Sequence, residues 1–464
     1  MDIVFRDLVK LWGQPVNEVN IDLDLPIGFI SIDTRTIEKG NFFVPLIGNK
    51  FDGHDFLDIA IEIGAQAAII SEKFYGSVPA CFPHWVVSDT LDAYQQLALL
   101  HRRKLNLPVV AITGSVGKTT TRELIRGILS SLGEIVSSRE NENNDIGVPK
   151  TLLRGTEGDS AYVIEMGMRG LGQIERLSRI SEPDIAVITN VGQAHIGILG
   201  SRENIAKAKS EITSNLKSNG VVIIPFGDNL LEKALREKWS GRIIRVAIEG
   251  EGLDWLGCDD SFAVKGIEPD YISQIDMQNN LISFEGVKLK LPLEGRHNAM
   301  NFLMALTVAS ELGISISNLN KLNINMPIGR NRLVDCGQFL VLDETYNASP
   351  ESVIASLELL VSKPGRHFAV LGTMLELGPQ SISLHQKVLQ RAVELGLMGI
   401  VFVSYSEESA IVKTIIKQLP YHDVVRTPKD AAISLLSWLL PGDNILIKGS
   451  RKMELEKVLP YLKQ

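Results

Sequence analysis

The segment from Val109 to Thr121, VVAITGSVGKTTT, constrains the fold more than any other part of the chain. Its apolar first half predicts a buried strand, and the apolar residues that recur every three or four positions after Thr121 predict a helix. A turn that holds two glycines and ends in the sequence GKTT lies between them. A strand, a glycine turn and a helix in this order form a phosphate-binding loop.

The residue types in this turn indicate a nucleoside triphosphate site. Glycine lets backbone N–H groups close around an anion at a helix N-terminus, Lys118 supplies positive charge, and the Thr119 hydroxyl is a ligand for Mg²⁺. The usual GxxxxGK[ST] motif is incomplete, because Ile112 occupies its first glycine position. The alternative is a tight turn without a ligand. The residues predicted to bind the phosphates of ATP are Gly114, Ser115, Val116, Gly117, Lys118, Thr119 and Thr120.

Length, charge and cysteine content restrict the class of protein. A chain of 464 residues is long enough for roughly two to four domains. Its formal net charge of −8 argues against a general binder of nucleic acid or anionic membranes. It has no apolar run near the about 20 residues of a membrane helix and no secretory signal pattern, so membrane insertion is not expected. Its three distant cysteines favour the reducing cytoplasm.

Alternating strand and helix patterns predict an α/β fold with three domains, at residues 1–107, 108–330 and 331–464. The first is a small α/β unit with predicted strands at 28–35, 67–70 and 84–87, and a predicted strand and turn within 40–48. The second has a mainly parallel sheet with predicted strands at 109–113, 161–165, 185–190 and 221–224, and an antiparallel edge within 243–293. The third is a new α/β series with predicted strands at 339–343, 368–371, 399–403 and 444–447.

Polar residues follow several predicted strands, where open parallel sheets bind ligands. Glu165 ends one strand and is a candidate Mg²⁺ ligand, although a helix N-cap or a surface acid would show the same pattern. His195 follows the next strand and is a candidate metal ligand or phosphate contact, although a lone histidine is more often structural. Lys207 and Lys209 lie in a predicted helix, where lysines are normally solvated.

A polar run, SRENENNDIGVP, carries Asn141, Asn143 and Asn144 in the central domain. Its amides can form several hydrogen bonds, but a solvated loop would have the same composition. In the last domain, the first strand runs into DETYN and the last into KGSR. These strand ends predict a second ligand-binding edge.

Taken together, these motifs resemble the Mur ligase family over essentially the whole chain. The resemblance rests on separated motifs in the family's order, and the shortened glycine loop is the form that this family uses. The motifs are Asp33-Thr34-Arg35, Asp52-Gly53-His54, TGSVGKTT, Asn141-x-Asn143-Asn144, Glu165-Met-Gly, Thr189-Asn-Val-Gly-x-Ala-His195, Gly295-Arg-His-Asn298-Ala-Met-Asn301, Gly329-Arg330, Asp343-x-x-Tyr346-Asn347, Met374-Leu-Glu-Leu-Gly378 and Lys448-Gly-Ser450-Arg451.

The resemblance implies a role for each domain. The N-terminal domain would hold the UDP end of a substrate through Ser31, Asp33, Arg35, Phe43, Asp52, Gly53 and His54. The central P-loop domain would bind ATP with help from Asn298, Asn301, Arg330 and Asp343. A Rossmann-like C-terminal domain would receive a dipeptide. Further substrate contacts would be Asn141, Asn143, Asn144, Tyr346, Asn347, Lys448, Ser450 and Arg451.

The resemblance also implies a metal site and a reaction. The ligands of Mg²⁺ would be Thr119, Glu165, His195 and Lys209, and Lys209 would be carbamylated and help to hold a second Mg²⁺. The catalytic residues would be Lys118, Glu165, His195 and Lys209. The implied reaction is ATP-dependent addition of D-alanyl-D-alanine to UDP-N-acetylmuramoyl-tripeptide through an acyl phosphate, with ADP and phosphate released. We expect a monomer whose domains close about linkers near residues 107 and 330.

Two alternatives remain on sequence grounds. A sister amide ligase, such as the enzyme that adds the third amino acid or a folylpolyglutamate synthase, would share the loop. The third-residue enzyme normally shows an Asp-Asn-Pro-Arg type of signature, which the chain lacks. A regulatory P-loop NTPase would hydrolyse nucleotide without an amino acceptor and would not need the DTR and DGH motifs.

Overall fold

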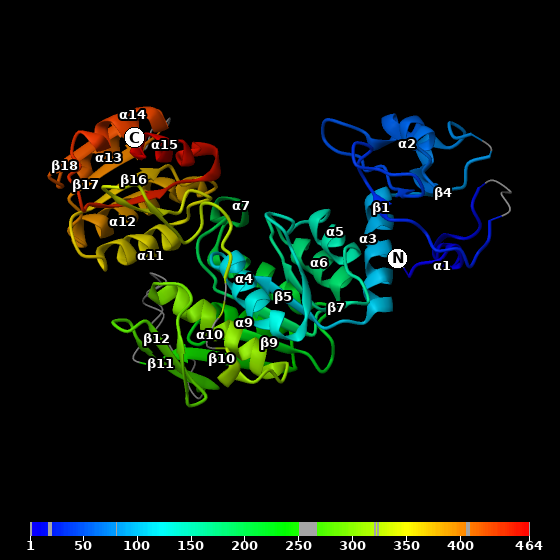
Figure 1. Ribbon diagram of the computed structural model, residues 1–464, viewed down its shortest axis with the longest axis horizontal. Coiled ribbons are helices and arrows are strands. Elements are labelled where there is room, and N and C mark those ends of the chain that lie inside the picture. The colour runs from blue at the N-terminus through cyan, green and yellow to red at the C-terminus, as the bar shows by residue number, and fades with distance from the viewer. Residues whose placement is uncertain are drawn as a thin grey trace.

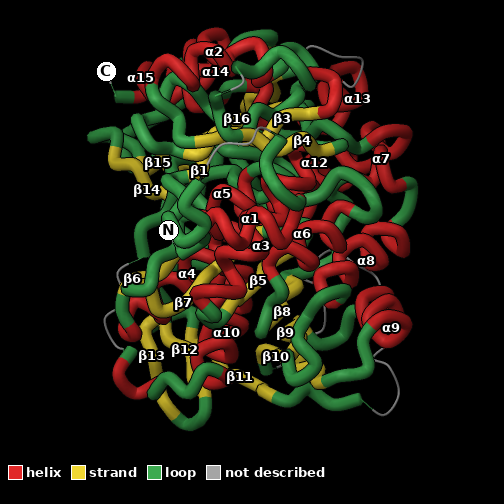
Figure 2. Tube along the Cα trace, turned by 90° about the vertical axis from the view of Figure 1, so that its right-hand side faces the viewer, coloured by secondary structure: helices red, strands yellow, loops and turns green. Residues whose placement is uncertain are grey.

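The computed structural model describes residues 2–16, 21–79, 81–249, 267–319, 322, 324–404 and 409–463, which form three sheets and their helices (Figure 1). In the side view of Figure 2, β3 and β16 of the outer two sheets lie above the strands of the central sheet. No helix in these ranges has both the length and the apolarity needed to span a membrane.

The N-terminal sheet is parallel and has the order β1-β2-β3-β4. Its strands are β1 (Ile30–Ser31), β2 (Phe42–Phe43), β3 (Ala67–Ser71) and β4 (His84–Val87), and its helices are α1 (Phe5–Trp12), α2 (Leu57–Ile63) and α3 (Thr90–Leu105). The strand predicted at 28–35 is wrong in length, because β1 spans only two residues. Within 40–48, where a strand and a turn are predicted, the strand β2 also spans two residues. After β1 the chain turns, since the Asp33 carboxylate accepts a hydrogen bond from the Arg35 N–H at 3.0 Å.

The central sheet has the order β13-β12-β11-β10-β9-β8-β5-β7-β6. Its strands are β5 (Val109–Thr113), β6 (Glu134–Ser137), β7 (Asp159–Glu165), β8 (Ile185–Ile188), β9 (Val221–Pro225), β10 (Arg242–Ile248), β11 (Tyr271–Asp276), β12 (Leu281–Phe284) and β13 (Val287–Lys290). The antiparallel edge is confirmed for β12 and β13. It begins at β11, which is antiparallel to β12 but parallel to β10, so β10 belongs to the parallel part. Residues 250–266 of the predicted edge lie outside the described residues.

Alternating side chains of β5 explain why the central sheet is covered on both faces. Val110 and Ile112 pack with α4 (Lys118–Leu129) and α10 (Arg296–Glu311). Val109 and Ala111 belong to the core on the other face. That core also holds residues of α3, α5 (Gly147–Leu153), α6 (Gln173–Ser181), α8 (Arg202–Ser210) and α9 (Asn229–Lys238). The short helix α7 (Ile196–Leu199) follows β8 and lies against the C-terminal domain (Figure 1).

The C-terminal sheet has the order β14-β15-β19-β16-β17-β18, and only β14 is antiparallel. Its strands are β14 (Arg332–Asp335), β15 (Leu340–Asp343), β16 (His367–Gly372), β17 (Gly399–Val403), β18 (Tyr421–Val425) and β19 (Asn444–Lys448). Its helices are α11 (Pro350–Val361), α12 (Ser381–Glu394), α13 (Ser409–Ile416), α14 (Pro428–Leu436) and α15 (Leu459–Leu462). β15 and β19 are neighbours, so their polar carboxyl ends meet at one edge.

Candidate active site

The glycine turn between β5 and α4 is held against the end of β8. Gly114 has φ +153°, and a Cβ there would lie 1.8 Å from the Thr189 hydroxyl oxygen. The Asn190 side chain bonds the turn twice, because its Oδ1 accepts the Val116 N–H at 3.0 Å and its Nδ2 donates to the Val116 carbonyl. In contrast, the first N–H groups of α4 have no carbonyl partner within the helix and remain available to an anion.

We expect the Gly114→Ala variant to lose about 1–3 kcal/mol of unfolding free energy and most of its ATP affinity. The added methyl group would displace Thr189 and with it the turn, whose backbone also favours glycine at this φ. Urea denaturation and ATP titration would measure both losses. Gly313→Ala is the matched control, since Gly313 also has positive φ but has no atom within 4 Å of an added Cβ. Equal losses in both variants would contradict the role of the contact with Thr189.

Glu165, at the end of β7, is buried beside the start of α4. Its carboxylate accepts hydrogen bonds from the Thr119 hydroxyl at 2.9 Å, the Asn143 amide at 2.9 Å and Arg122 at 3.2 Å. Burial alone would raise the pKa of Glu165, but the charges of Arg122 and Lys118 lower it below its ordinary value. The readings of Glu165 as an N-cap or a surface acid are therefore wrong.

The asparagine run has a mixed structure. Asn143 reaches Glu165, and the Asn144 side-chain oxygen accepts the N–H groups of Ile146 and Gly147 at the start of α5. The side chain of Asn141 is exposed. A wholly solvated loop is thus excluded, and the run positions Glu165 through Asn143.

His195 pairs with the C-terminal domain. Its Nδ1 donates to the Glu376 carboxylate at 2.6 Å, which leaves Nε2 for a ligand. Burial and the charge of Lys118 lower the pKa of His195, although Glu376 acts in the opposite direction. His195 also lines the cavity that is described below.

Lys209 is almost fully buried in α8, so the general reading of helical lysines as solvated does not hold for it, whereas Lys207 is exposed. Burial first, and the charge of Lys118 second, hold the pKa of Lys209 well below its ordinary value, while Glu351 acts against them. The lowered pKa increases the share of the neutral amine form of Lys209 at a given pH.

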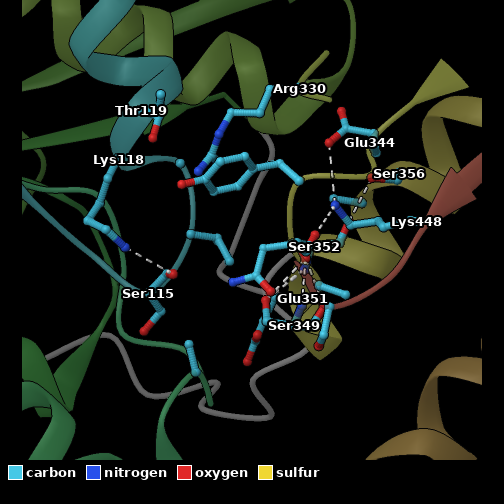
Figure 3. A pocket seen from close by; sticks show the side chains of 18 of the residues that line it. Ser115, Lys118, Thr119, Arg330, Glu344, Ser349, Glu351, Ser352, Ser356 and Lys448 are labelled. Carbon is cyan, nitrogen blue, oxygen red and sulfur yellow. Dashed lines mark hydrogen bonds and ion pairs between the residues drawn. The ribbon is translucent and has the colours of Figure 1, made fainter. Parts of the chain in front are cut away.

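A cavity of about 460 Å³ joins the glycine turn to the C-terminal domain (Figure 3). Figure 3 shows Ser115 and Lys118 on one side and Glu344 and Lys448 on the other. The predicted site residues that line the cavity are Ser115, Val116, Gly117, Lys118, Thr119, Thr120, His195, Asn298, Asn301, Arg330, Tyr346, Asn347, Lys448, Ser450 and Arg451. The lining residues that were not predicted include Arg169, Asn190, His297, Glu344, Ser349, Glu351 and Glu376.

The C-terminal wall of the cavity is cationic and aromatic. The Arg330 guanidinium stacks 3.8 Å from the centre of the Tyr346 ring. The Lys448 amine donates to the Asn347 carbonyl at 3.1 Å and pairs with Glu344 at 3.4 Å. The positive charges of this wall can hold an anionic group or a terminal carboxylate.

The expected contact of Asp343 with ATP is not supported by its position. Its side chain is fully buried, and its Oδ1 accepts hydrogen bonds from the N–H and the hydroxyl of Thr345. Asp343 does not line the cavity, whereas its neighbour Glu344 does. Of the two acidic residues at the carboxyl end of β15, Glu344 is therefore the one placed to contact a ligand there.

The predicted UDP-binding residues lie in the N-terminal domain, away from the cavity lining. Arg35 and Asp33 form an exposed ion pair, which lowers the pKa of Asp33 to about 2. The side chains of Phe43 and His54 are buried, so direct substrate contact through them is not supported. His54 instead accepts the Ser71 N–H and pairs with Asp52 at 2.6 Å. Ser31 and Gly53 lie on the same domain.

Family models match three consecutive parts of the chain. They are described as "Mur ligase family, catalytic domain" at residues 26–112, "Mur ligase middle domain" at 112–309 and "Mur ligase, glutamate ligase domain" at 329–451. Together they cover more than half of the chain.

Similar proteins and structures extend over nearly the whole length. A UDP-N-acetylmuramoyl-tripeptide–D-alanyl-D-alanine ligase of Synechocystis sp. is 37% identical and covers 96% of this chain and 93% of its own length. The Escherichia coli ligase of the same name is 32% identical, with 95% coverage of both chains. A crystal structure of MurF from Acinetobacter baumannii has TM-score 0.81 and 31% identity, covering 94% and 93%. MurF from Thermotoga maritima in complex with ADP has TM-score 0.79 and 28% identity, covering 94% and 97%. The chain belongs to the Mur ligase family.

Proposed function

We propose that the chain joins D-alanyl-D-alanine to UDP-N-acetylmuramoyl-tripeptide at the expense of ATP, giving the pentapeptide precursor of peptidoglycan, ADP and phosphate. The observation that carries this proposal is the cavity that brings the glycine turn together with the polar strand ends of the C-terminal domain. The relatives named for this reaction cover 96% and 95% of the chain, which supports it over a sister ligase.

The first step activates the terminal carboxylate of the tripeptide. A carboxylate is a poor electrophile, so it takes the γ-phosphoryl group of ATP and becomes an acyl phosphate. Two anions must meet in line for this transfer. The Lys118 amine and the N–H groups at the start of α4 offset their repulsion by binding the phosphates at fixed positions.

In the second step the free amine of the dipeptide attacks the acyl phosphate, and phosphate leaves from a tetrahedral intermediate. The cationic wall formed by Arg330, Lys448 and Arg451 would hold the dipeptide carboxylate or a phosphate group. Because water competes with the amine, the domains must exclude it by closing together. We assign residues 1–107 to the UDP end, 108–330 to ATP and 331–464 to the dipeptide.

The residues around Glu165 fit a magnesium ion. The Thr119 hydroxyl and the Glu165 carboxylate supply the oxygen ligands that Mg²⁺ prefers, and they lie 2.9 Å apart at the glycine turn. Mg²⁺ would neutralise charge on the phosphates. Within the described ranges no cluster of three or more His, Cys, Asp or Glu side chains forms a ready-made metal site. The phosphates would complete the ligand set of this ion, and a carbamylated Lys209 with His195 would help to hold a second Mg²⁺.

The cellular setting follows from the same chemistry. One substrate is linked to UDP and the reaction uses ATP, which favours the cytoplasm. We propose a monomer as the working unit. We propose no nucleic-acid or membrane partner.

Phosphate release with ATP, Mg²⁺ and UDP-N-acetylmuramoyl-tripeptide tests the acceptor. We expect release to depend on D-alanyl-D-alanine and to be at least about a hundredfold slower with single amino acids, because a site built for the dipeptide leaves polar groups unpaired with a shorter acceptor. Release with another amine instead would assign the chain to a sister ligase. Release without any acceptor would support a regulatory NTPase.

A further inference from the structure

Glu351 is a buried carboxylate for which the family motifs assign no role. It is the second residue of α11 in the C-terminal domain, and its residue surface is 5% exposed. Its Oε1 accepts the N–H of Gln193 at 2.6 Å. Gln193 belongs to the central domain, in the segment between β8 and α7 that leads to His195. The bond therefore joins two domains inside the candidate active site.

The contact is also close-packed. A Cβ added to Gly192 would lie 2.7 Å from the Glu351 carboxyl carbon. The N–H of Gly192 in turn donates to the Ser115 hydroxyl oxygen at 2.9 Å. A continuous path thus runs from Ser115 in the glycine turn, through Gly192 and Gln193, to the carboxylate of Glu351. Figure 3 labels the two ends of this path, Ser115 and Glu351.

The same segment is held a second time by the C-terminal domain. His195 pairs with Glu376, and the Gly197 N–H donates to the main-chain carbonyl of Glu376 at 3.1 Å. The segment that leads from β8 into α7 thus contacts the C-terminal domain at two points, Gln193 and the pair His195 and Gly197. Of these two attachments, the one through Glu351 continues directly to the glycine turn.

The electrostatic setting of Glu351 sets it apart from a surface acid. Burial raises the pKa of its carboxyl group, while the N–H of Gln193 lowers it. Its second oxygen, Oε2, has no hydrogen-bond partner among the described residues. Burying a partly satisfied carboxylate is unfavourable, so simple packing would be better served by an apolar side chain.

We propose that Glu351 is a positioning residue that seats the C-terminal domain on the segment 191–195 and thereby couples the position of the bound dipeptide to the glycine turn. This rests on the proposed ligase reaction. The role concerns the step in which the amine attacks, when both domains must be aligned. Binding of ATP alone uses the central domain and does not need this contact.

Kinetics of two variants test the proposal. Glu351→Ala removes the acceptor for Gln193, and we expect kcat with the dipeptide to fall about ten- to a hundredfold, as for loss of a hydrogen bond to a charged group. The dissociation constant of ATP, measured by equilibrium binding, should stay within about twofold. Glu351→Gln keeps an oxygen that can accept the Gln193 N–H, and it should recover most of kcat.

Glu358→Gln is the matched control. Glu358 lies on the same helix and pairs with Arg391 at the surface, outside the cavity lining. We expect it to keep the wild-type kcat. An inactive Glu351→Gln would overturn the positioning role, because it would show that the charge is required, and an unaffected Glu351→Ala would overturn it as well.

A double-mutant cycle isolates the contact itself. Gly192→Ala should lower kcat like Glu351→Ala, because the methyl group occupies the carboxylate's place. The double variant should lose no more than the worse single variant, whereas fully additive losses would contradict the proposal. Failure of the ligase reaction would be distinct, since wild-type phosphate release would then ignore the dipeptide.

Discussion

Replacing Lys118 with alanine is expected to lower kcat for ligation about a thousandfold, the larger end of the range for one preorganised group that stabilises developing charge. The Lys118 amine lies at the glycine turn, where it donates to the Gly114 carbonyl at 2.7 Å. Burial lowers the pKa of Lys118, and bound phosphates would favour its charged form. Steady-state phosphate release with all three substrates measures the loss.

Two controls accompany Lys118→Ala. Lys233→Ala removes an exposed lysine of α9 and should keep the wild-type rate. The melting temperature of Lys118→Ala should not fall, because the variant removes a half-buried cation of the cavity lining whose partial desolvation is unfavourable. A variant that ligates at more than about a tenth of the wild-type rate would contradict the assignment of Lys118 to the phosphates.

Replacing Lys209 with alanine is expected to lower kcat by about a hundred- to a thousandfold. Only a neutral amine reacts with CO₂, and the depressed pKa of Lys209 supplies that form. Intact-mass measurement with labelled bicarbonate should show one added CO₂ in wild type and none in Lys209→Ala. As the pH falls through the depressed pKa, the amine gains a proton and the carbamate should be lost.

Lys207→Ala is the control for Lys209, since Lys207 lies in the same helix but is exposed. It should keep both the label and the rate. A wild-type protein that never gains the label while remaining fully active would contradict the carbamate. A labelled Lys209→Ala would show that another group reacts.

Much of the fold is predictable because its signals are local. The apolar run of β5, the glycines and the helix pattern of α4 lie next to one another in sequence. The lengths of β1 and β2 cannot be predicted from local sequence, because they depend on where the turn at Asp33 interrupts strand pairing. β6, β14 and β18 were not predicted, since their mixed polar composition carries little strand periodicity.

The site residues are less predictable, because burial in the folded chain decides which side chains can contact a ligand. Lys209 and Lys207 lie two residues apart on α8, and only packing shows that the first is buried. Asp343 and Glu344 are likewise adjacent, yet they face opposite environments. Glu376 belongs to the MLELG motif, so the sequence did indicate a functional role for it. Glu351 had none, because its partner Gln193 lies 158 residues away.

The most direct test of the central claim follows the oxygen atoms of the tripeptide. The protein is incubated with ATP, Mg²⁺, D-alanyl-D-alanine and UDP-N-acetylmuramoyl-tripeptide whose terminal carboxylate carries heavy oxygen, and both products are read by mass spectrometry. The account predicts that one heavy oxygen atom passes from the carboxylate to the released phosphate, while the other stays in the new amide. The product should therefore be heavier than the labelled substrate by the mass of one dipeptide minus that of one water molecule that carries heavy oxygen. Unlabelled phosphate, or a product without the dipeptide, would contradict it.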